Sequence, residues 1–210
     1  MVRTEKTKTT ALVLVFICLI VSVLTSVLDG FPIEKYGICK GSPILARLVY
    51  SFFHASIPHA LINCWCLLSI VFIYDISISS LIIAYITAVT FPIDTLSSVC
   101  CGTAATTPTV GLSAVCFSLL GQIAFQVKRK RLFHTWVLSV IAIGFILPPL
   151  CSVCGYAIAT PNNLLHIYCY VAGLLVGFLN SPANESHHAR MNDRVQWRVI
   201  KDNSPAHERK

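Results

Sequence analysis

Long apolar segments separated by short polar ones constrain this chain more than any other feature of its sequence. One of them, residues 110–127, follows the polar stretch 103–109 and ends at the basic run 128–131. As a helix rising about 1.5 Å per residue, this segment is just long enough to cross a hydrocarbon core of about 30 Å. The chain is 55% hydrophobic and 12% charged, and a soluble domain has about twice that charged fraction. The sequence therefore predicts a membrane protein.

Six segments of this kind predict an all-α polytopic membrane protein with a bundle of six transmembrane helices. The first is long for the core of a signal peptide and no A-x-A-like cleavage site follows it, so we interpret it as a retained helix. The predicted parts are a cytoplasmic N-terminal arm (1–10), a membrane domain (11–180) and a basic, disordered cytoplasmic tail (181–210). The predicted spans are residues 11–28, 50–74, 76–93, 110–127, 132–151 and 164–179.

The distribution of Lys and Arg predicts the orientation of the bundle. Six spans put both termini on one side, and the basic residues of the N-terminal arm, the 128–131 run and the tail all fall there. By the positive-inside rule this side is cytoplasmic. The net charge of +7 is explained by retention beside the membrane, so no nucleic-acid partner is expected. We expect a multi-pass protein of the bacterial inner (plasma) membrane that contacts the lipid bilayer; the sequence indicates no oligomeric state.

Polar side chains of the second, fourth and sixth predicted spans fall at one depth. These three spans run in the same direction, which places His54, His59, Ser113 and His166 in the outer halves of their helices. Ionisable residues within membrane helices are candidates for function. Side chains from three neighbouring helices at one depth therefore predict a site.

The residue types predict that this site is a serine–histidine pair. A serine hydroxyl becomes a nucleophile when a base takes its proton, and His166 is placed to do this for Ser113. His59 and Asn63 are four residues apart, so they share a helix face and can both donate to a developing oxyanion. Phe117 follows Ser113 by one turn and can stack on the imidazole. No Asp or Glu lies near the outer ends of these helices, so a pair is expected rather than a triad.

Other interpretations of the polar side chains stay open. Polar residues of membrane helices often hydrogen-bond between helices, a contact worth about 0.6 kcal/mol on average, and histidines can relay protons in a channel or transporter. A metal site formed by His54, His59 and His166 is disfavoured, because a spacing of five residues is poor for chelation and no acidic ligand is near. We expect no metal and no cofactor.

Three motifs lie in order on the expected helices, and they are His54-x4-His59-x3-Asn63, Gly111-x-Ser113-x3-Phe117 and Gly173-x3-Gly177. Together they resemble the rhomboid family of intramembrane serine proteases. The stretch 46–49, which contains Arg47, is similar to the Trp-Arg loop motif of that family without its tryptophan, and the likeness covers roughly residues 10–180. The resemblance implies a six-helix rhomboid-like bundle that cleaves single-span membrane proteins near the outer face.

The resemblance also assigns roles to residues. It implies that Ser113 is the nucleophile, that His59 and Asn63 support the oxyanion, and that Gly173 and Gly177 let the sixth span pack on the fourth. Gly111 is expected to allow a close approach of another backbone.

One position departs from the family pattern. The family's catalytic histidine lies three residues before the first glycine of the last motif, where this chain has Tyr170, and tyrosine is a poor base at neutral pH. His166 lies one turn earlier on the same face. Either the glycine register is shifted, or Tyr170 hydrogen-bonds the Ser113–His166 pair. The alternative function is a rhomboid-like pseudoprotease that binds membrane-protein clients without cutting them. We favour an active enzyme, because the serine, both oxyanion residues and a histidine occur together.

Four cysteines fall on the outer side in the predicted topology, where oxidation is possible. A disulfide between the third loop and the end of the fifth span is compatible with their positions, and so are free thiols. The four are Cys100, Cys101, Cys151 and Cys154.

Overall fold

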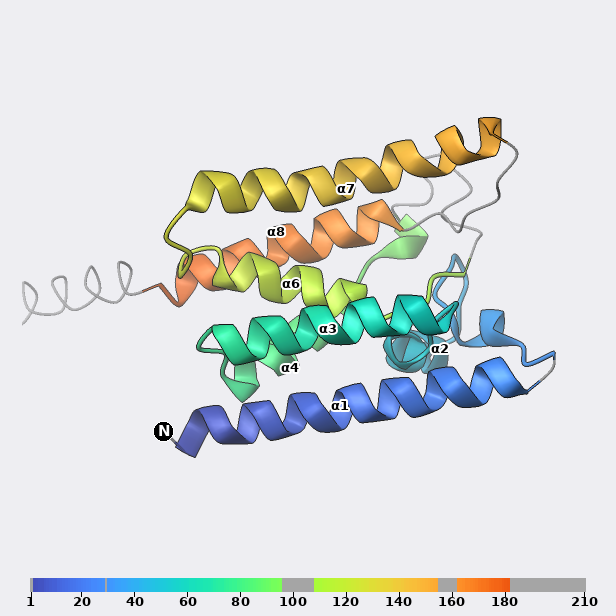
Figure 1. The fold of residues 1–210 in the computed structure, drawn as a ribbon, viewed down its shortest axis with the longest axis horizontal. Coiled ribbons are helices and arrows are strands. Elements are labelled where there is room, and N and C mark those ends of the chain that lie inside the picture. Colours follow the sequence, from blue (N-terminus) through green and yellow to red (C-terminus); the bar gives the residue numbers. More distant parts are fainter. Residues whose placement is uncertain (1, 29, 96–107, 155–161, 182–210) are drawn as a thin grey trace, which may run out of the picture.

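The computed structural model describes residues 2–28, 30–95, 108–154 and 162–181, and within these ranges the chain is helical, with no β-strand (Figure 1). The all-α fold predicted from the sequence is therefore confirmed for the described residues. The elements are α1 (Val2–Val27), the 3₁₀ helix η1 (Ile33–Tyr36), α2 (Ile44–Val49), the 3₁₀ helix η2 (Tyr50–Phe52), α3 (Ile57–Ile73), α4 (Ile78–Val89), α6 (Ser113–Ile123), α7 (Lys130–Val153) and α8 (Asn163–Leu179).

Three segments are long and apolar enough to cross a membrane, and a bent pair of helices is a fourth candidate. The three are Glu5–Val27 in α1, Ile78–Thr95 around α4, and α7. The bent pair joins Ile44–Phe52 to Ile57–Ile73 at an angle of 82°. The apolar helices α6 and α8 are shorter than a single span. The count of six spans therefore stays a prediction. The apolar helices nevertheless indicate that the chain is an integral membrane protein.

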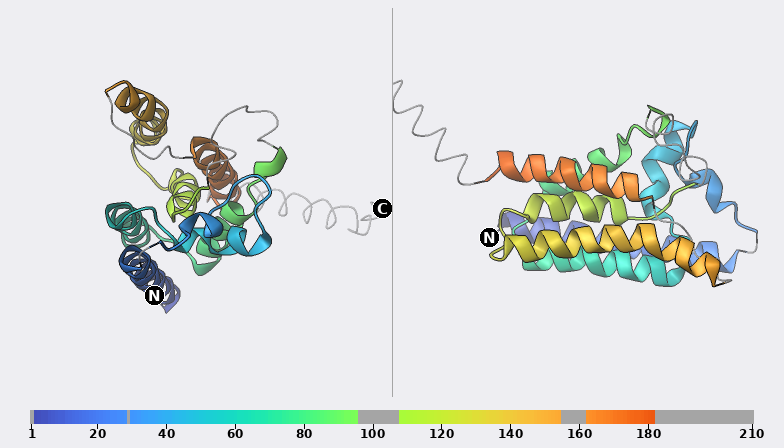
Figure 2. Two further views of the ribbon diagram at one scale, coloured as in Figure 1. Left: turned by 90° about the vertical axis from the view of Figure 1, so that its right-hand side faces the viewer. Right: turned by 90° about the horizontal axis from the view of Figure 1, so that it is seen from above.

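α6 lies at the centre of the bundle, and every residue from Ala114 to Ile123 is buried. α3, α4 and α8 pack around it (Figures 1 and 2). The helix has 11 residues and is about 16 Å long, so the prediction of one span over residues 110–127 was wrong in length. It begins late because Gly111, with φ of +125°, is not helical, and it ends in a turn in which the Gln126 N–H donates to Ile123 O.

The second predicted span, residues 50–74, is also not one helix. η2 ends at Phe52, and α3 begins at Ile57 after the Ser56 hydroxyl accepts a hydrogen bond from the His59 N–H at 3.3 Å. Ser, followed by Pro in the first turn, is a typical helix start, because the first N–H groups of a helix have no acceptor within it. The sequence predicted that His54 lies on this helix. In the structure His54 precedes α3.

The remaining helices match the predicted spans with shifted ends. α7 and α8 lie within two residues of the predicted ranges 132–151 and 164–179. α4 ends at Val89, earlier than the predicted residue 93. α1 starts at Val2, so the segment predicted as a polar arm continues the first apolar helix, with the Thr9 and Thr10 hydroxyls bonded to carbonyls one turn back.

The two ends of the bundle differ in charge. The start of α1, the turn between α6 and α7 and the end of α8 lie at one end, on the left in Figure 1. We call it the basic end, because Lys8, Lys128 and the neighbouring residues 129–131 lie there. Ser113, at the start of α6, lies toward the opposite end, which we call the serine end. That the basic end faces the cytoplasm stays a prediction.

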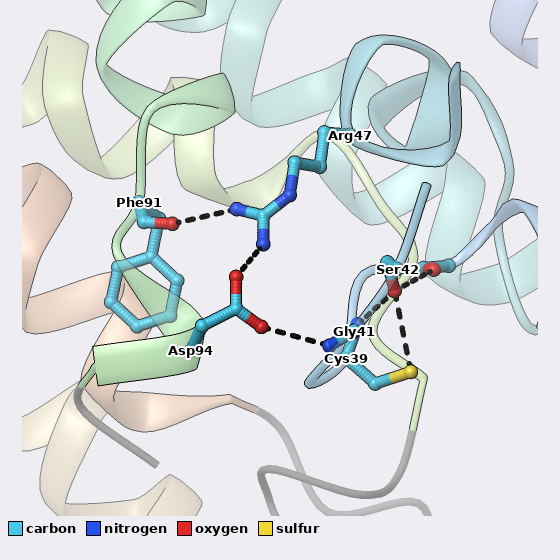
Figure 3. A network of polar contacts seen from close by, with 7 residues as sticks. Cys39, Gly41, Ser42, Arg47, Phe91 and Asp94 are labelled. Carbon is cyan, nitrogen blue, oxygen red and sulfur yellow. Dashed lines mark hydrogen bonds and ion pairs between the residues drawn. The ribbon is translucent and has the colours of Figure 1, made fainter. Parts of the chain in front are cut away.

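Loops at the serine end are tied together by polar contacts (Figure 3). The Arg47 guanidinium on α2 donates to Phe91 O at 3.3 Å and pairs with the Asp94 carboxylate, which also accepts from the Gly41 N–H at 2.8 Å. Ile38, in the same loop, exchanges two backbone hydrogen bonds of 2.9 Å with Thr109, just before α6. Arg47 thus fastens the first loop to the end of α4, and that loop in turn holds the segment that leads to Ser113.

Candidate active site

Ser113 and His166 meet at the serine end of the bundle. Ser113 is the first residue of α6, His166 lies in the first turn of α8, and Ser113 Oγ is 2.9 Å from His166 Nε2. The Phe117 ring stacks on the imidazole, with centroids 4.4 Å apart and planes 22° apart. The imidazole is therefore held between the serine hydroxyl and an aromatic face, as the spacing of Ser113 and Phe117 indicated.

The start of α8 is fastened to the segment before α6. The Asn162 side chain caps α8 by accepting from the Leu165 N–H at 3.1 Å, and its amide nitrogen donates to the Thr109 hydroxyl at 3.2 Å. His166 follows this cap by one turn, so the cap fixes the height of the imidazole relative to Ser113. Sequence reasoning missed Asn162, although asparagine is among the preferred residues for capping a helix start.

The Ser113 hydroxyl can donate to His166 when Nε2 is unprotonated and the ring proton is on Nδ1. Within the described ranges, no Asp or Glu side chain hydrogen-bonds this imidazole. The arrangement is thus a pair without a carboxylate in the part of the chain that the structure describes.

His59 and Asn63 lie beside the segment that enters α6. A Cβ added to Gly111 would come within 2.9 Å of His59 Cε1 and 3.2 Å of Asn63 Nδ2. The Asn63 amide nitrogen is buried and has no hydrogen-bond partner among the described residues. A buried donor without an acceptor is costly, and here it belongs to a side chain that lines the same cavity as Ser113. Only glycine fits at position 111, because of both its φ of +125° and this contact.

His54 contacts the backbone that leads into α6 rather than Ser113. Its Nε2 accepts from the Leu112 N–H at 3.3 Å, and its Nδ1 lies 3.5 Å from the Ser22 hydroxyl, which donates to Cys18 O at 2.7 Å. One tautomer, with the proton on Nδ1, satisfies this whole chain of hydrogen bonds. Its ring also meets that of His59 edge-on at 5.2 Å. His54 therefore links α1 to the start of α6.

Tyr170 lies away from the Ser113–His166 pair. Its hydroxyl is 2.6 Å from His134 Nδ1, on α7. In the family pattern, the first glycine of the motif lies three residues after the catalytic histidine. Three residues after His166 this chain has the fully buried Cys169, and Gly173 follows four residues after that. The structure thus brings His166, not Tyr170, to Ser113. Relative to this histidine, the glycine motif lies one helical turn later than in the family pattern. His134 was not singled out from the sequence, where it is a lone histidine after the basic run.

Glycines let α8 lie directly on α6. A Cβ added to Gly173 would be 2.1 Å from Ser118 O, one added to Gly177 would be 2.5 Å from Gln122 O, and one added to Gly121 would be 2.3 Å from Tyr170 O. Real Cβ atoms do not come so close to another backbone. The two helices that carry Ser113 and His166 are therefore in backbone contact.

Among the residues that the structure describes, two cavities reach Ser113. One, of about 420 Å³, opens among polar side chains that include Ser56, His59, Asn162 and His166. The other, of about 570 Å³, is an apolar groove between α3, α6 and α7 that runs from Ser113 past Trp65 and Trp136 to Tyr74. The first offers access to water and the second offers contact with an apolar chain.

Two further expectations from the sequence concern metal and disulfides. In the ranges described, His54, His59 and His166 do not form a group able to hold a metal ion. Cys151 and Cys154 are free thiols. Cys100 and Cys101 lie outside the described residues, as do residues 182–210 of the predicted tail.

The fold and the site together define a helical membrane protein with a serine–histidine pair on two closely packed helices. The family model of the Rhomboid domain matches residues 44–183, which is well over half of the chain. The chain therefore belongs to the rhomboid family. No curated protein and no solved structure matched it.

Proposed function

We propose that this protein is an intramembrane serine protease that cleaves single-span membrane proteins with Ser113 as nucleophile and His166 as general base. Family membership implies a rhomboid-like protease or pseudoprotease. The observation that carries the choice is the 2.9 Å contact between Ser113 Oγ and His166 Nε2, with Phe117 stacked behind the imidazole. A pseudoprotease has no chemical need to keep a nucleophile in contact with a base.

The reaction would follow the general course of serine acyl transfer. His166 Nε2 takes the Ser113 proton as Oγ attacks the scissile carbonyl, and the imidazolium then gives this proton to the leaving amine. Water hydrolyses the acyl-enzyme with His166 again acting as base. The unpartnered Asn63 amide supports a role as an oxyanion donor. Further donors are the His59 ring and the Ser113 N–H, which belongs to the first turn of α6 and has no acceptor within the helix.

The two cavities support the proposed substrate class. A helical peptide bond is shielded and its carbonyl is already hydrogen-bonded, so the substrate must unwind locally to reach Ser113. The apolar groove between α3 and α7 suits the helical part, and the polar cavity suits the unwound part. We expect residues of low helix propensity near the cleaved bond. The predicted topology places cleavage near the outer face of the bacterial inner membrane.

A fluorophosphonate probe tests the proposal on the purified full chain in detergent. Wild-type protein should be labelled, and Ser113→Ala should abolish labelling. His166→Ala should reduce it by several orders of magnitude, because members of a catalytic unit fail together. Ser118→Ala is the matched control: this buried serine lies on the same helix, its hydroxyl has no partner in the described ranges, and its loss should leave labelling unchanged.

The pH dependence gives a second test. Only the neutral imidazole accepts a proton, so the labelling rate should be low in acid, rise through the imidazole range and then level off. A tyrosine base would place the rise near pH 10.

Failure of the wild-type protein both to take up the probe and to cleave a membrane reporter would contradict the proposed proteolysis. The protein would then be a pseudoprotease, or one that uses its histidines for another task such as proton transfer.

A further inference from the structure

A further cleft lies at the basic end of the bundle, where it shares Ile73 and Tyr74 with the end of the apolar groove that is away from Ser113. It is formed by the first turns of α1, the turn between α3 and α4 and the turn between α6 and α7, and its volume is about 640 Å³. The charged side chains of this cleft have no role in the proposed proteolysis. Its lining residues are Lys8, Phe72, Ile73, Tyr74, Asp75, Gln126, Val127 and Lys128.

The cleft holds two cations and one anion that are not paired with each other. Lys8 Nζ lies 5.5 Å from the centroid of the Phe72 ring, and Lys128 faces the same cleft from the turn before α7. Asp75 is the carboxylate of the cleft. In the described ranges, neither lysine forms an ion pair with it or with another carboxylate. A contact with an aromatic face leaves ammonium donors of Lys8 available to a ligand.

The rim of the cleft is apolar. Phe72 and Ile73, in the last turn of α3, are 50% and 72% exposed. The predicted first span begins at residue 11, shortly after Lys8, so the cleft lies where the predicted spans meet lipid headgroups. A ligand that fits must combine a charged head with an apolar part.

We propose that this cleft binds a membrane phospholipid whose headgroup carries a primary ammonium, such as phosphatidylethanolamine. Lys8 and Lys128 hold the phosphate through charge-assisted hydrogen bonds, Asp75 accepts from the ammonium, and the acyl chains lie along Phe72 and Ile73. Basic pockets between membrane helices are known sites for phospholipid headgroups. Asp75 favours a headgroup that also carries a positive charge over a purely anionic one.

Native mass spectrometry of the full chain in detergent tests this binding, with lipids of identical acyl chains added one at a time. Phosphatidylethanolamine should give several times more one-lipid adduct than phosphatidylglycerol, which has no ammonium, or phosphatidylcholine, whose quaternary ammonium cannot donate to Asp75. Soluble glycerophosphoethanolamine should not bind at the same concentration. Equal occupancy by the soluble headgroup would overturn the lipid assignment.

Three variants locate the site. Lys8→Gln combined with Lys128→Gln should lower the adduct about tenfold, because two charged contacts to the phosphate are lost. Asp75→Asn should keep phospholipid binding but remove the preference for phosphatidylethanolamine over phosphatidylglycerol. Lys35→Gln combined with Lys40→Gln, in the loop at the serine end, is the matched control and should bind as wild type does.

The outcome does not depend on proteolysis, because an inactive protein would bind the lipid equally well. Wild-type binding by the Lys8–Lys128 variant, or an unchanged preference in Asp75→Asn, would overturn the proposal. Asp75→Asn keeps the test decisive even if the double variant folds poorly, since its readout is a ratio between two lipids on one protein.

Discussion

α8 and α7 flank the apolar centre of the molecule, but they are held in different ways. α8 lies in backbone contact with α6 through Gly121, Gly173 and Gly177. α7 is longer, yet most of its apolar side chains are exposed, and it stands at the edge of the bundle (Figure 2). A hydrogen bond between Tyr170 and His134 ties it to α8. The residues that would react are thus on the tightly packed pair, and a wall of the apolar groove is on the loosely packed helix.

The largest effect should come from breaking the tight pair. Gly173→Leu puts a Cβ where Ser118 O lies 2.1 Å away, so α6 and α8 must separate and the Ser113–His166 contact must be lost. We expect a loss of roughly 4 kcal/mol or more in the free energy of unfolding, seen as little folded protein and no labelling. Leu175→Ala, on the exposed face of the same helix, is the control and should fold. A folded, labelled Gly173→Leu protein would refute the contact between these two helices.

A smaller effect should come from the ring that supports the imidazole. Phe117→Ala removes the stacked face 4.4 Å from the His166 ring and should slow fluorophosphonate labelling about tenfold. Phe125→Ala, near the basic end, removes a ring that contacts Phe178 instead and should leave the rate unchanged. Labelling of folded Phe117→Ala at the wild-type rate would show that the stack does not orient the base.

The smallest effect should come from the contact that holds α7. Tyr170→Phe removes only the hydroxyl bonded to His134, so it should cost about 1 kcal/mol, seen as a fall of a few degrees in the thermal midpoint. His134→Gln added to it should cost little more, because both changes remove one interaction. Labelling of Ser113 should be unchanged in both variants. A strong loss of labelling in Tyr170→Phe would indicate that this hydroxyl acts on the Ser113–His166 pair after all.

The helical fold was predictable because apolar segments of this length have few alternatives in a membrane, where every backbone group must bond internally. The pairing of Ser113 with His166 followed from three spans that run in the same direction. The roles of these residues, and those of His59 and Asn63, stay proposals until the labelling experiments are done.

Other features had a weak local signal or none. The bend at 53–56 had a signal in Ser56 and Pro58, but the continuous apolar composition outweighed it. α6 ends at Ile123, in a turn in which the Gln126 N–H donates to Ile123 O, before the basic run that marked the end of the predicted span. The shifted glycine register could be fixed only by seeing which turn of α8 faces Ser118 O. His134 gave no signal, because its partner lies on another helix.

The complete burial of α6 has a consequence for the order of assembly. This helix is too short to span a bilayer alone and carries Gln122 and Ser118, so lipid is a poor solvent for it until α3, α4 and α8 surround it. α8 is the last helix that the structure describes, and it brings both His166 and the glycines that α6 packs against. A ribosome must therefore have passed residue 177 before the central helix has its final neighbours. Ser113 can therefore meet His166 in this arrangement only on a nascent chain long enough to include α8.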